Sequence, residues 1–341
     1  MATDPQSTPP STQFRTDGGV KVLHGVRYVC VVILNWNNAP DTLKCLDSIL
    51  ESDYSSFSVV TIDNGSTDDS AEIIRRHKPR IPLVETHRNL GYAAGNNLGI
   101  RLALETGARY VLILNNDVVV SPPALTELVS VAEADESIGI VGPAVYFYDD
   151  PETICEAGNR IEWPGLRLMQ FHRGVRSVPD CEAYEVDYAS GCALLVKREV
   201  FDGVGLFDER FFLYFEETDF CLRSKMMGYR TVIVPWARVW HKISSSNGLN
   251  SPLVTYYMTR NQFLLIRNAR RGRQRILSFV AAATGETRTL LACTLKPRCR
   301  RLDRMRILRI ARYHGLRDGL LGRYGPVGLS TARSLDSAER T

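Results

Sequence analysis

The residues of this chain best suited to bind a metal ion are Asp117, His241 and an acidic cluster of Glu216, Glu217 and Asp219. Asp117 directly follows an apolar segment and two asparagines. Because an unpaired buried charge is costly, a strand that ends in two amides and a carboxylate is expected to present them to a polar ligand. Carboxylates and an imidazole that converge on one cleft would hold a divalent cation, which would serve a phosphate-bearing substrate. The pattern predicts an enzyme.

The same residues also have ordinary structural interpretations. A single histidine after an apolar strand is usually structural, and acids at the start of a helix are favoured by the helix dipole without any further role. Against this, a carboxylate near a metal-bound leaving group is what a general base for a hydroxyl requires. The acidic cluster therefore contains the candidate base.

Two loops are candidates for binding a nucleotide. The first runs from Asp63 to Asp68 in the sequence Asp-Asn-Gly-Ser-Thr-Asp, which would also suit a plain turn with a helix cap. In the functional interpretation, Asp63 accepts a hydrogen bond from the imide of uracil or thymine. The second, 89–97, has spaced glycines at a helix start, where free amides could meet phosphates. It matches neither the dinucleotide-binding fingerprint nor the P-loop, which argues against an oxidoreductase or an ATPase.

The elements that position these residues alternate along the chain. Strand-like runs that are apolar at nearly every position, separated by helix-length segments, are typical of a parallel sheet covered by helices on both faces. Ligands of such sheets bind beyond the carboxyl ends of the strands, and here three strand ends are unusually polar. We therefore predict an α/β fold with right-handed crossovers. The apolar runs are 28–34, 58–62, 81–85, 110–114 and 138–147, and the polar ends are 35–37, 63–66 and 115–117.

Composition divides the chain into four regions. Residues 1–26 are rich in Ser, Thr and Pro and are predicted to be a disordered leader. A catalytic domain is expected over 27–250, with a nucleotide-binding half, 27–147, and a turn-rich acceptor half, 148–250. A basic amphipathic helical region over 251–325 and a disordered tail over 326–341 complete the predicted organisation.

The net charge of +4 conceals a strong asymmetry. Between Arg260 and Gly325 there are 17 basic and three acidic side chains, a net +14, which leaves −10 for the rest. An acidic body needs a cation to hold an anionic nucleotide, whereas the basic region favours an anionic surface. Aromatic residues are sparse there and no RNA-binding signature is present, so no nucleic acid is expected. We expect 260–325 to rest on an anionic membrane surface, with a solvated helical face as the alternative.

Other features concern the compartment. No stretch approaches the ~18 to 20 apolar residues of a membrane span, and the N-terminus has no signal-peptide core. The eight cysteines form no C-x-x-C pair and lie mostly in apolar runs, which favours buried free thiols and a reducing compartment. A cytoplasmic protein, peripheral at the inner face of the cell membrane, is therefore expected.

Eight ordered motifs resemble those of family 2 inverting glycosyltransferases, in the rhamnosyltransferase-like branch, over about residues 28 to 268. Such a series in one order is far more specific than any single motif. The motifs are Leu-Asn-Trp-Asn at 34–37, Ile-Asp-Asn-Gly-Ser-Thr-Asp at 62–68, Asn-Leu-Gly-Tyr at 89–92, Asn-Asn-Asp at 115–117, Ser-Gly-Cys-Ala at 190–193, Phe-Asp-Glu at 207–209, Phe-Glu-Glu-Thr-Asp-Phe-Cys-Leu-Arg at 215–223 and Trp-His at 240–241.

The resemblance implies a GT-A fold, Mg2+ or Mn2+, and a nucleotide-diphosphate sugar donor, UDP- or dTDP-linked. By position, Asp63 matches the base-binding aspartate and Asp117 the final acid of the D-x-D element. Glu217 matches the catalytic base, with Asp219 and Glu216 as alternates, and His241 the histidine that completes the metal site. The expected donor-binding residues are Asn35, Trp36, Asn37, Asp63, Gly65, Ser66, Asn89, Gly91, Tyr92, Asn96, Asn116 and Gly191.

Two positions depart from the family pattern. The D-x-D element is Asn-Asn-Asp, which leaves one carboxylate for the metal, and the base is Glu where Asp is usual. The implied reaction is transfer of a sugar, with rhamnose as a candidate, to a hydroxyl of a glycan or lipid-linked acceptor in cell-surface polysaccharide synthesis. Alternatives are a catalytically silent scaffold that binds nucleotide sugar or membrane, and a nucleotidyltransferase of similar fold. The latter should carry a glycine-rich, basic phosphate loop near the first strand, where this chain has 35–37.

Overall fold

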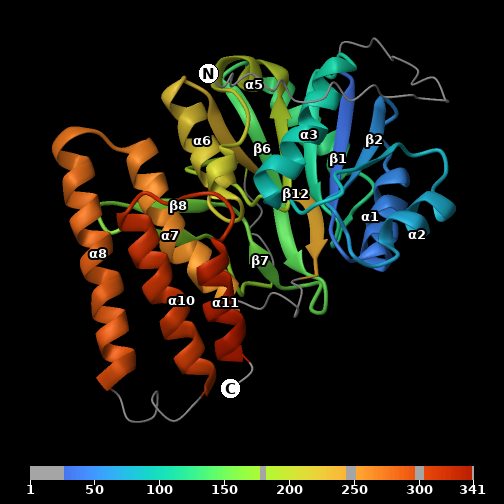
Figure 1. Cartoon of the computed structure of the whole chain (residues 1–341). Helices are drawn as coiled ribbons and strands as arrows, with labels where there is room; N and C mark the ends of the chain where they lie inside the picture. Colours follow the sequence, from blue (N-terminus) through green and yellow to red (C-terminus); the bar gives the residue numbers. More distant parts are fainter. Residues whose placement is uncertain (1–26, 177–181, 243–250, 296–302, 340–341) are drawn as a thin grey trace, which may run out of the picture.

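The computed structural model describes residues 27–176, 182–242, 251–295 and 303–339. An α/β body is followed by long C-terminal helices that pack along one side of it (Figure 1). The predicted leader, 1–26, lies outside the described residues.

Within these residues, the body is built on a ten-stranded sheet of order β10-β12-β6-β11-β4-β1-β2-β3, with β5 beside β12 and β7 beside β6. The pairs β1–β2, β1–β4, β2–β3 and β6–β12 are parallel, and β11 is antiparallel to β4 and β6. The predicted, mostly parallel α/β sheet is confirmed. The strands are β1 (Val29–Asn35), β2 (Phe57–Asp63), β3 (Leu83–Glu85), β4 (Tyr110–Asn115), β5 (Val118–Val120), β6 (Ile138–Phe147), β7 (Ile154–Glu156), β10 (Tyr184–Val186), β11 (Ala193–Lys197) and β12 (Arg230–His241), with β8 (Asn159–Glu162) and β9 (Arg167–Gln170) as a separate hairpin.

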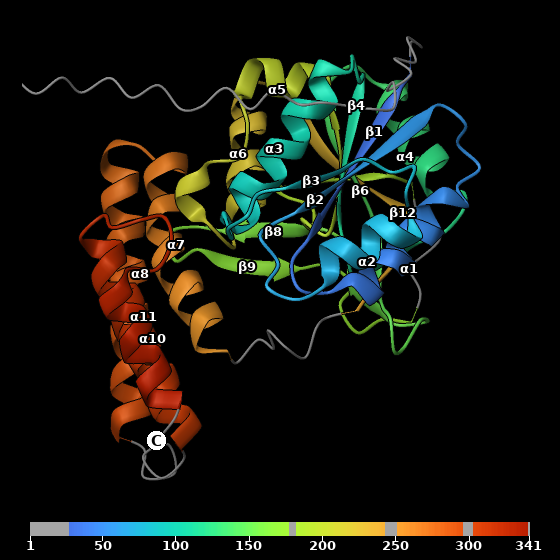
Figure 2. The ribbon, with the colours of Figure 1, turned by 45° about the vertical axis from the view of Figure 1, so that its right-hand side comes forward.

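Helices cover both faces of the sheet because successive side chains of a strand point to opposite sides. In β1, Cys30 and Val32 join one core cluster, and Val29, Val31 and Ile33 join the other. The first cluster includes side chains of α3, α5 and α6, and the second includes side chains of α1, α2 and α4. Figure 2 shows these two sets of helices on either side of the sheet. These helices are α1 (Ala39–Leu50), α2 (Ser70–His77), α3 (Gly91–Glu105), α4 (Ala124–Ala134), α5 (Arg198–Val204) and α6 (Glu216–Met226), and a 3-10 turn, η1, spans Glu209–Phe211.

The C-terminal helices are α7 (Pro252–Ala269), α8 (Gly272–Leu295), α10 (Asp303–Leu320) and α11 (Leu329–Glu339). Helix α10 packs closely on α7 because it carries glycine at the contact: a Cβ on Gly315 would lie 2.7 Å from the carbonyl oxygen of Tyr256. None of the helices, over the ranges described, combines the length and the apolar composition that crossing a bilayer demands. The six cysteines in these ranges are free thiols, and five of them are buried.

The prediction of a disordered tail over 326–341 is wrong where α11 forms, over Leu329–Glu339. Helix α11 forms there because Leu335 is buried in a cluster with Tyr256 and Tyr257 of α7. The Thr331 hydroxyl also accepts a hydrogen bond from Arg317 of α10, at 3.1 Å. These are tertiary contacts, which the polar composition of the segment does not reveal.

Candidate active site

A cavity of about 740 Å³ opens where the carboxyl end of β4, the start of α6 and the C-terminal helices meet. Residues from all three regions line it, so its walls come from distant parts of the chain. Its lining includes Tyr92, Asn115, Asp117, Glu156, Tyr188, Ser190, Gly191, Glu216, Glu217, His241, Met258, Gln262, Glu286 and Arg312.

The cavity brings together the two residues predicted to bind metal. Strand β5 pairs antiparallel with β12 and sets His241 opposite Val118, directly after Asp117. The backbone N–H of Lys242 donates to the carbonyl of Asp117 at 2.9 Å, which fixes the contact. The Nε2 atom of His241 lies 3.1 Å from Oδ1 of Asp117, and both side chains are half-buried.

The donor set of Asp117 and His241 fits a divalent cation only if the substrate completes it. Over the described ranges, no group of three His, Cys, Asp or Glu side chains is placed to hold a metal ion. Mg2+ in particular is usually bound by one or two carboxylates together with substrate phosphates and water. One carboxylate and one imidazole therefore suit a cation that arrives with a diphosphate.

The N-terminus of α6 places two carboxylates in the same cavity. Burial raises the pKa of Glu217 to about 7, and the nearby Glu156 carboxylate adds to the effect. Burial, together with the Glu217 charge, raises the pKa of Glu216 well above its usual range. Gly191 lies directly against this group: a Cβ there would lie 3.3 Å from Cγ of Glu217 and 3.4 Å from the Tyr92 hydroxyl.

Asp219, an alternate candidate for the base, is not brought to the cavity. Its carboxylate is buried, and it accepts from Nε of Arg223 at 2.7 Å and from the Asn268 amide at 2.8 Å. Side chains two positions apart on a helix point in different directions. Asp219 therefore ties α6 to α7, while Glu217 faces the cavity.

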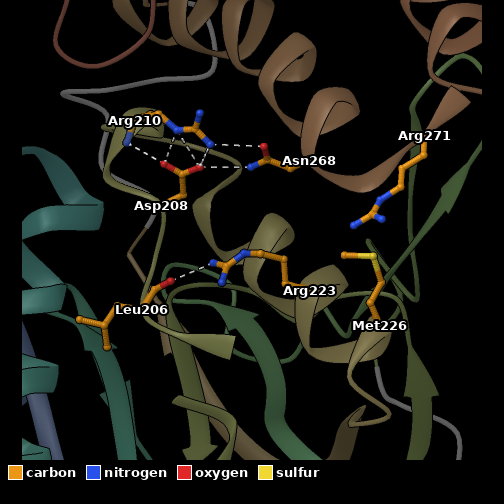
Figure 3. Close-up of a pocket in the computed structure, with 7 residues that line it drawn as sticks. All are labelled: Leu206, Asp208, Arg210, Arg223, Met226, Asn268 and Arg271. Atoms are coloured by element: carbon orange, nitrogen blue, oxygen red, sulfur yellow. Dashed lines mark hydrogen bonds and ion pairs between the residues drawn. The ribbon is translucent and has the colours of Figure 1, made fainter. Parts of the chain in front are cut away.

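The partners of Asp219 line a second, shallower pocket of about 390 Å³ (Figure 3). There the Arg210 guanidinium donates to both carboxylate oxygens of Asp208, and the Asn268 amide bridges the pair. Arg223 donates to the carbonyl of Leu206 at 2.9 Å. These groups satisfy one another, which indicates a structural joint between α6 and α7.

The predicted base-binding loop is organised around the Asp63 carboxylate. It accepts from the Asn35 amide at 2.7 Å, and from the Ser66 hydroxyl and N–H at 2.6 and 3.0 Å. Asp63 is nearly and Asn35 completely buried, so Asn35 orients the loop from beneath. Gly65 has a φ of +69°, and a Cβ there would collide with the backbone of Arg88. Trp36 and Asn37 are exposed beside this loop.

Of the other predicted donor-binding residues, some line the cavity and others make hydrogen bonds within the fold. Tyr92 lines the cavity and donates to the carbonyl of Gly191 at 2.6 Å. Asn116 is half-buried and donates to the Thr42 hydroxyl at 2.9 Å. Asn96 is completely buried and donates to a backbone carbonyl of its own helix. Asn89 accepts a hydrogen bond from the N–H of Gly91, the first residue of α3, at 2.8 Å.

Sequence reasoning missed several residues of the cavity. Glu156 enters because β7 pairs with β6, and burial raises the pKa of its carboxyl. Gln262, Glu286 and Arg312 enter through the C-terminal helices. None of them lies at a predicted strand end, so no local signal pointed to them.

A strained loop leads into α6. Phe212, Tyr214 and Phe215 have φ of +66°, +67° and +75°, and such conformations cost about 1–3 kcal/mol each in residues other than glycine. The Phe212 carbonyl also accepts from the N–H of Tyr92 at 2.7 Å, and a Cβ on Gly91 would lie 2.5 Å from that oxygen. This loop therefore sets both the start of α6 and its contact with α3.

Arg260 and Asn261 of α7, which we name the α7 clamp, hold this loop. The Asn261 amide donates to the carbonyls of Phe211, Leu213 and Tyr214, at 3.0, 2.8 and 2.9 Å. Arg260 donates to the Phe211 carbonyl at 2.9 Å. Both clamp side chains are completely buried.

We predict that Asn261→Ala lowers the free energy of unfolding by about 2 kcal/mol or more, because each buried polar group left without a partner costs about 1–3 kcal/mol. Thr287→Ala is the control, since its exposed hydroxyl bonds only within its own helix, and it should change stability by less than about 0.5 kcal/mol. Urea unfolding measures both. Equal midpoints for the two variants would show that the clamp does not stabilise the fold.

Solved structures share this fold. A mannosyltransferase from Pyrobaculum calidifontis, solved with GDP-Man and Mn2+, superposes with a TM-score of 0.56 at 18% identity, over 91% of this chain and 92% of its own. S. aureus TarS, residues 1-349, gives a TM-score of 0.54 at 15% identity, over 92% and 91%. The chain has the GT-A glycosyltransferase fold.

Two curated relatives are similar to this chain over most of their own length. An N-acetylglucosaminyl-diphospho-decaprenol L-rhamnosyltransferase of Mycobacterium tuberculosis is 29% identical over 70% of this chain and 84% of its own. The dTDP-rhamnosyl transferase RfbF of Shigella flexneri is 29% identical over 70% and 80%. Residues 30–205, about half of the chain, match the model of the family "Glycosyl transferase family 2". Together with the fold and the ordered motifs, this match establishes that the chain belongs to glycosyl transferase family 2.

Proposed function

We propose that this glycosyltransferase is metal-dependent and inverting, and that it transfers a sugar from a UDP- or dTDP-linked donor to a hydroxyl of a lipid-linked glycan. One observation carries the proposal: Asp117, His241 and Glu217 line one cavity although three separate elements supply them. A silent scaffold would have no reason to keep all three. The names of the two relatives support rhamnose as the sugar and a lipid diphosphate in the acceptor.

In this mechanism the residues of the chain divide the work between donor and acceptor. Asp117 and His241 would hold Mg2+ or Mn2+, which when bound neutralises the charge of the leaving diphosphate. Asp63 and its loop orient the base of the donor. Glu217 accepts the proton of the acceptor hydroxyl as that oxygen attacks the anomeric carbon from the face opposite the diphosphate. A single displacement inverts the configuration at that carbon.

A transfer assay tests the reaction class directly. The protein is incubated with UDP- and dTDP-linked sugars, Mn2+ and a lipid-diphosphate glycan acceptor, and NMR of the product gives the anomeric configuration. Inverted configuration is expected. Retained configuration in the product would rule out the single displacement.

We predict that Glu217→Gln leaves donor binding near normal and lowers turnover by about 10²-fold or more, since the amide cannot accept the proton. In the unmodified protein, turnover should rise with pH through about 7, because a raised pKa keeps Glu217 protonated and inactive as a base below that pH. Asp219→Asn is the comparison and should lower stability more than it alters the pH profile. If Asp219→Asn instead causes the larger loss of turnover, the base is misassigned.

We predict that Asp117→Ala abolishes the Mn2+-dependent binding of nucleoside diphosphate while the protein stays folded. Binding is measured as the rise in melting temperature with UDP or dTDP plus Mn2+, since a ligand of the native state stabilises it. Asp47→Ala removes a carboxylate on α1 that pairs with Lys78 away from the cavity, and it should keep the full rise. An unchanged rise in Asp117→Ala would refute the metal assignment.

We further propose that the chain works at the inner, cytoplasmic face of the cell membrane, bound through 260–325. The outer face of α8 supports this, because it exposes arginine together with apolar side chains: Arg273, Ile276, Leu277, Val280, Arg288 and Leu291. Apolar side chains beside basic ones suit the headgroup region of an anionic lipid surface.

We predict that the protein pellets with anionic vesicles and that added salt weakens this binding, since exposed charges are screened over ~8 Å at physiological ionic strength. Arg273→Glu with Arg288→Glu should release it. The control, Arg76→Glu with Arg80→Glu, makes the same change of charge on exposed residues of the body and should not. Equal pelleting with neutral and anionic vesicles would show that charge is not the cause.

A further inference from the structure

One wall of the cavity is contributed by the C-terminal helices. Gln262 of α7, Glu286 of α8 and Arg312 of α10 meet there, and we name this group the helical wall. The Gln262 amide donates to Oε1 of Glu286 at 3.0 Å, and Nη1 of Arg312 donates to Oε2 of the same carboxylate at 2.5 Å. These contacts give Arg312 a defined position beside the cavity.

Arg312 differs in charge from the rest of the cavity. Among the described residues that line it, Arg312 is the single arginine or lysine, whereas five carboxylates line it: Asp117, Glu156, Glu216, Glu217 and Glu286. An anionic group that enters this cavity is repelled by those of the five carboxyl groups that are ionised. The surroundings of Arg312 are the exception.

The environment of Arg312 suits a phosphate. Its side chain is 30% exposed, so it is partly withdrawn from water yet reachable from the cavity. A guanidinium has five N–H donors in a planar fork that matches phosphate oxygens, and Nη1 alone is engaged by Glu286. Partial burial strengthens such a contact relative to one at the surface.

We propose that Arg312 binds a phosphate of the acceptor diphosphate, while Glu286 positions the guanidinium and competes for it. This inference rests on the proposed function, in which the donor diphosphate binds beside Asp117 and His241 and the acceptor diphosphate binds elsewhere in the cavity. Those two residues follow β4 and end β12, whereas the helical wall comes from α7, α8 and α10. In this proposal, the protein recognises the diphosphate of the acceptor as well as its sugar.

The position of α8 agrees with the assignment of a lipid-linked acceptor to this part of the cavity. Glu286 faces the cavity, and Val280, Thr287 and Leu291 face solvent on the other side of the same helix. A lipid-linked substrate whose diphosphate rests at Arg312 lies next to the helix that we expect to contact the membrane.

Binding of geranyl diphosphate, a short soluble lipid diphosphate, tests the proposal. Calorimetry is performed on the full chain with UDP, dTDP and Mn2+ in excess, so that the donor site is filled, and geraniol is the phosphate-free comparison. Arg312→Gln should weaken geranyl diphosphate binding by about tenfold or more, because it removes a charged hydrogen-bond partner. Glu286→Gln should strengthen it, because the competing carboxylate is gone. Arg309→Gln is the control on the same helix, where the guanidinium bonds to the carbonyl of Cys293, and binding should be unchanged.

The opposite signs separate phosphate recognition from a purely structural ion pair. If Arg312→Gln and Glu286→Gln both weaken binding, the pair only ties α8 to α10 and the proposal is overturned. Absence of saturable binding to the unmodified protein, or equal binding of geraniol, overturns it too. Binding of UDP and dTDP with Mn2+ to the unmodified protein is measured first. Absence of that binding would count against the proposed function, whereas the variants alone decide whether Arg312 binds phosphate.

Discussion

The geometry of the active site depends on the hydrogen bonds that the α7 clamp makes to backbone carbonyls of 211–214. A fully buried guanidinium without a carboxylate partner is costly. Arg260 is accommodated by carbonyl oxygens and by the rings of Tyr256, Tyr257 and Tyr324, whose centroids lie 5.4, 4.7 and 5.9 Å away. These hydrogen bonds hold the loop in a conformation in which Phe212, Tyr214 and Phe215 have positive φ, and this conformation places the start of α6 beside the cavity. The C-terminal helices therefore help to shape the cavity and are not an appendage to the sheet.

The charged side chains that line the cavity are mostly acidic. Glu156, Glu216 and Glu217 all line the cavity, and burial together with the Glu156 charge raises the pKa of Glu217. An anionic donor in such surroundings requires a positive charge, which a metal ion at Asp117 and His241 would supply. The charge asymmetry of the sequence, −10 in the body and +14 in the basic region, has its counterpart inside the cavity. There Arg312 comes from the basic region, whereas Asp117, Glu156, Glu216 and Glu217 come from the body.

The sheet could be predicted because its strands are apolar on both faces, and that pattern is local. The approach of Asp117 to His241 could be predicted from the resemblance, and the pairing of β5 with β12 produces it. Other features depend on tertiary contacts that the sequence does not display. Glu217 and Asp219 carry the same group two residues apart, and the direction each faces separates their roles. Asn35 and Asn96 are polar residues in polar motifs, yet the fold uses both as internal hydrogen-bond donors.

The contact between Arg260 and Gly325 has a consequence for how the protein matures. The guanidinium donates through Nη1 to the carbonyl of Gly325 at 2.5 Å, so the clamp is complete only when this late residue is in place. Domains generally fold from the N-terminus as a chain leaves the ribosome. The nascent chain can thus form its sheet and the loop around Asp63 while α10 is still being synthesised. The start of α6 is held in place through α7 only after residue 325 has been synthesised, so this side of the cavity is completed later than the sheet.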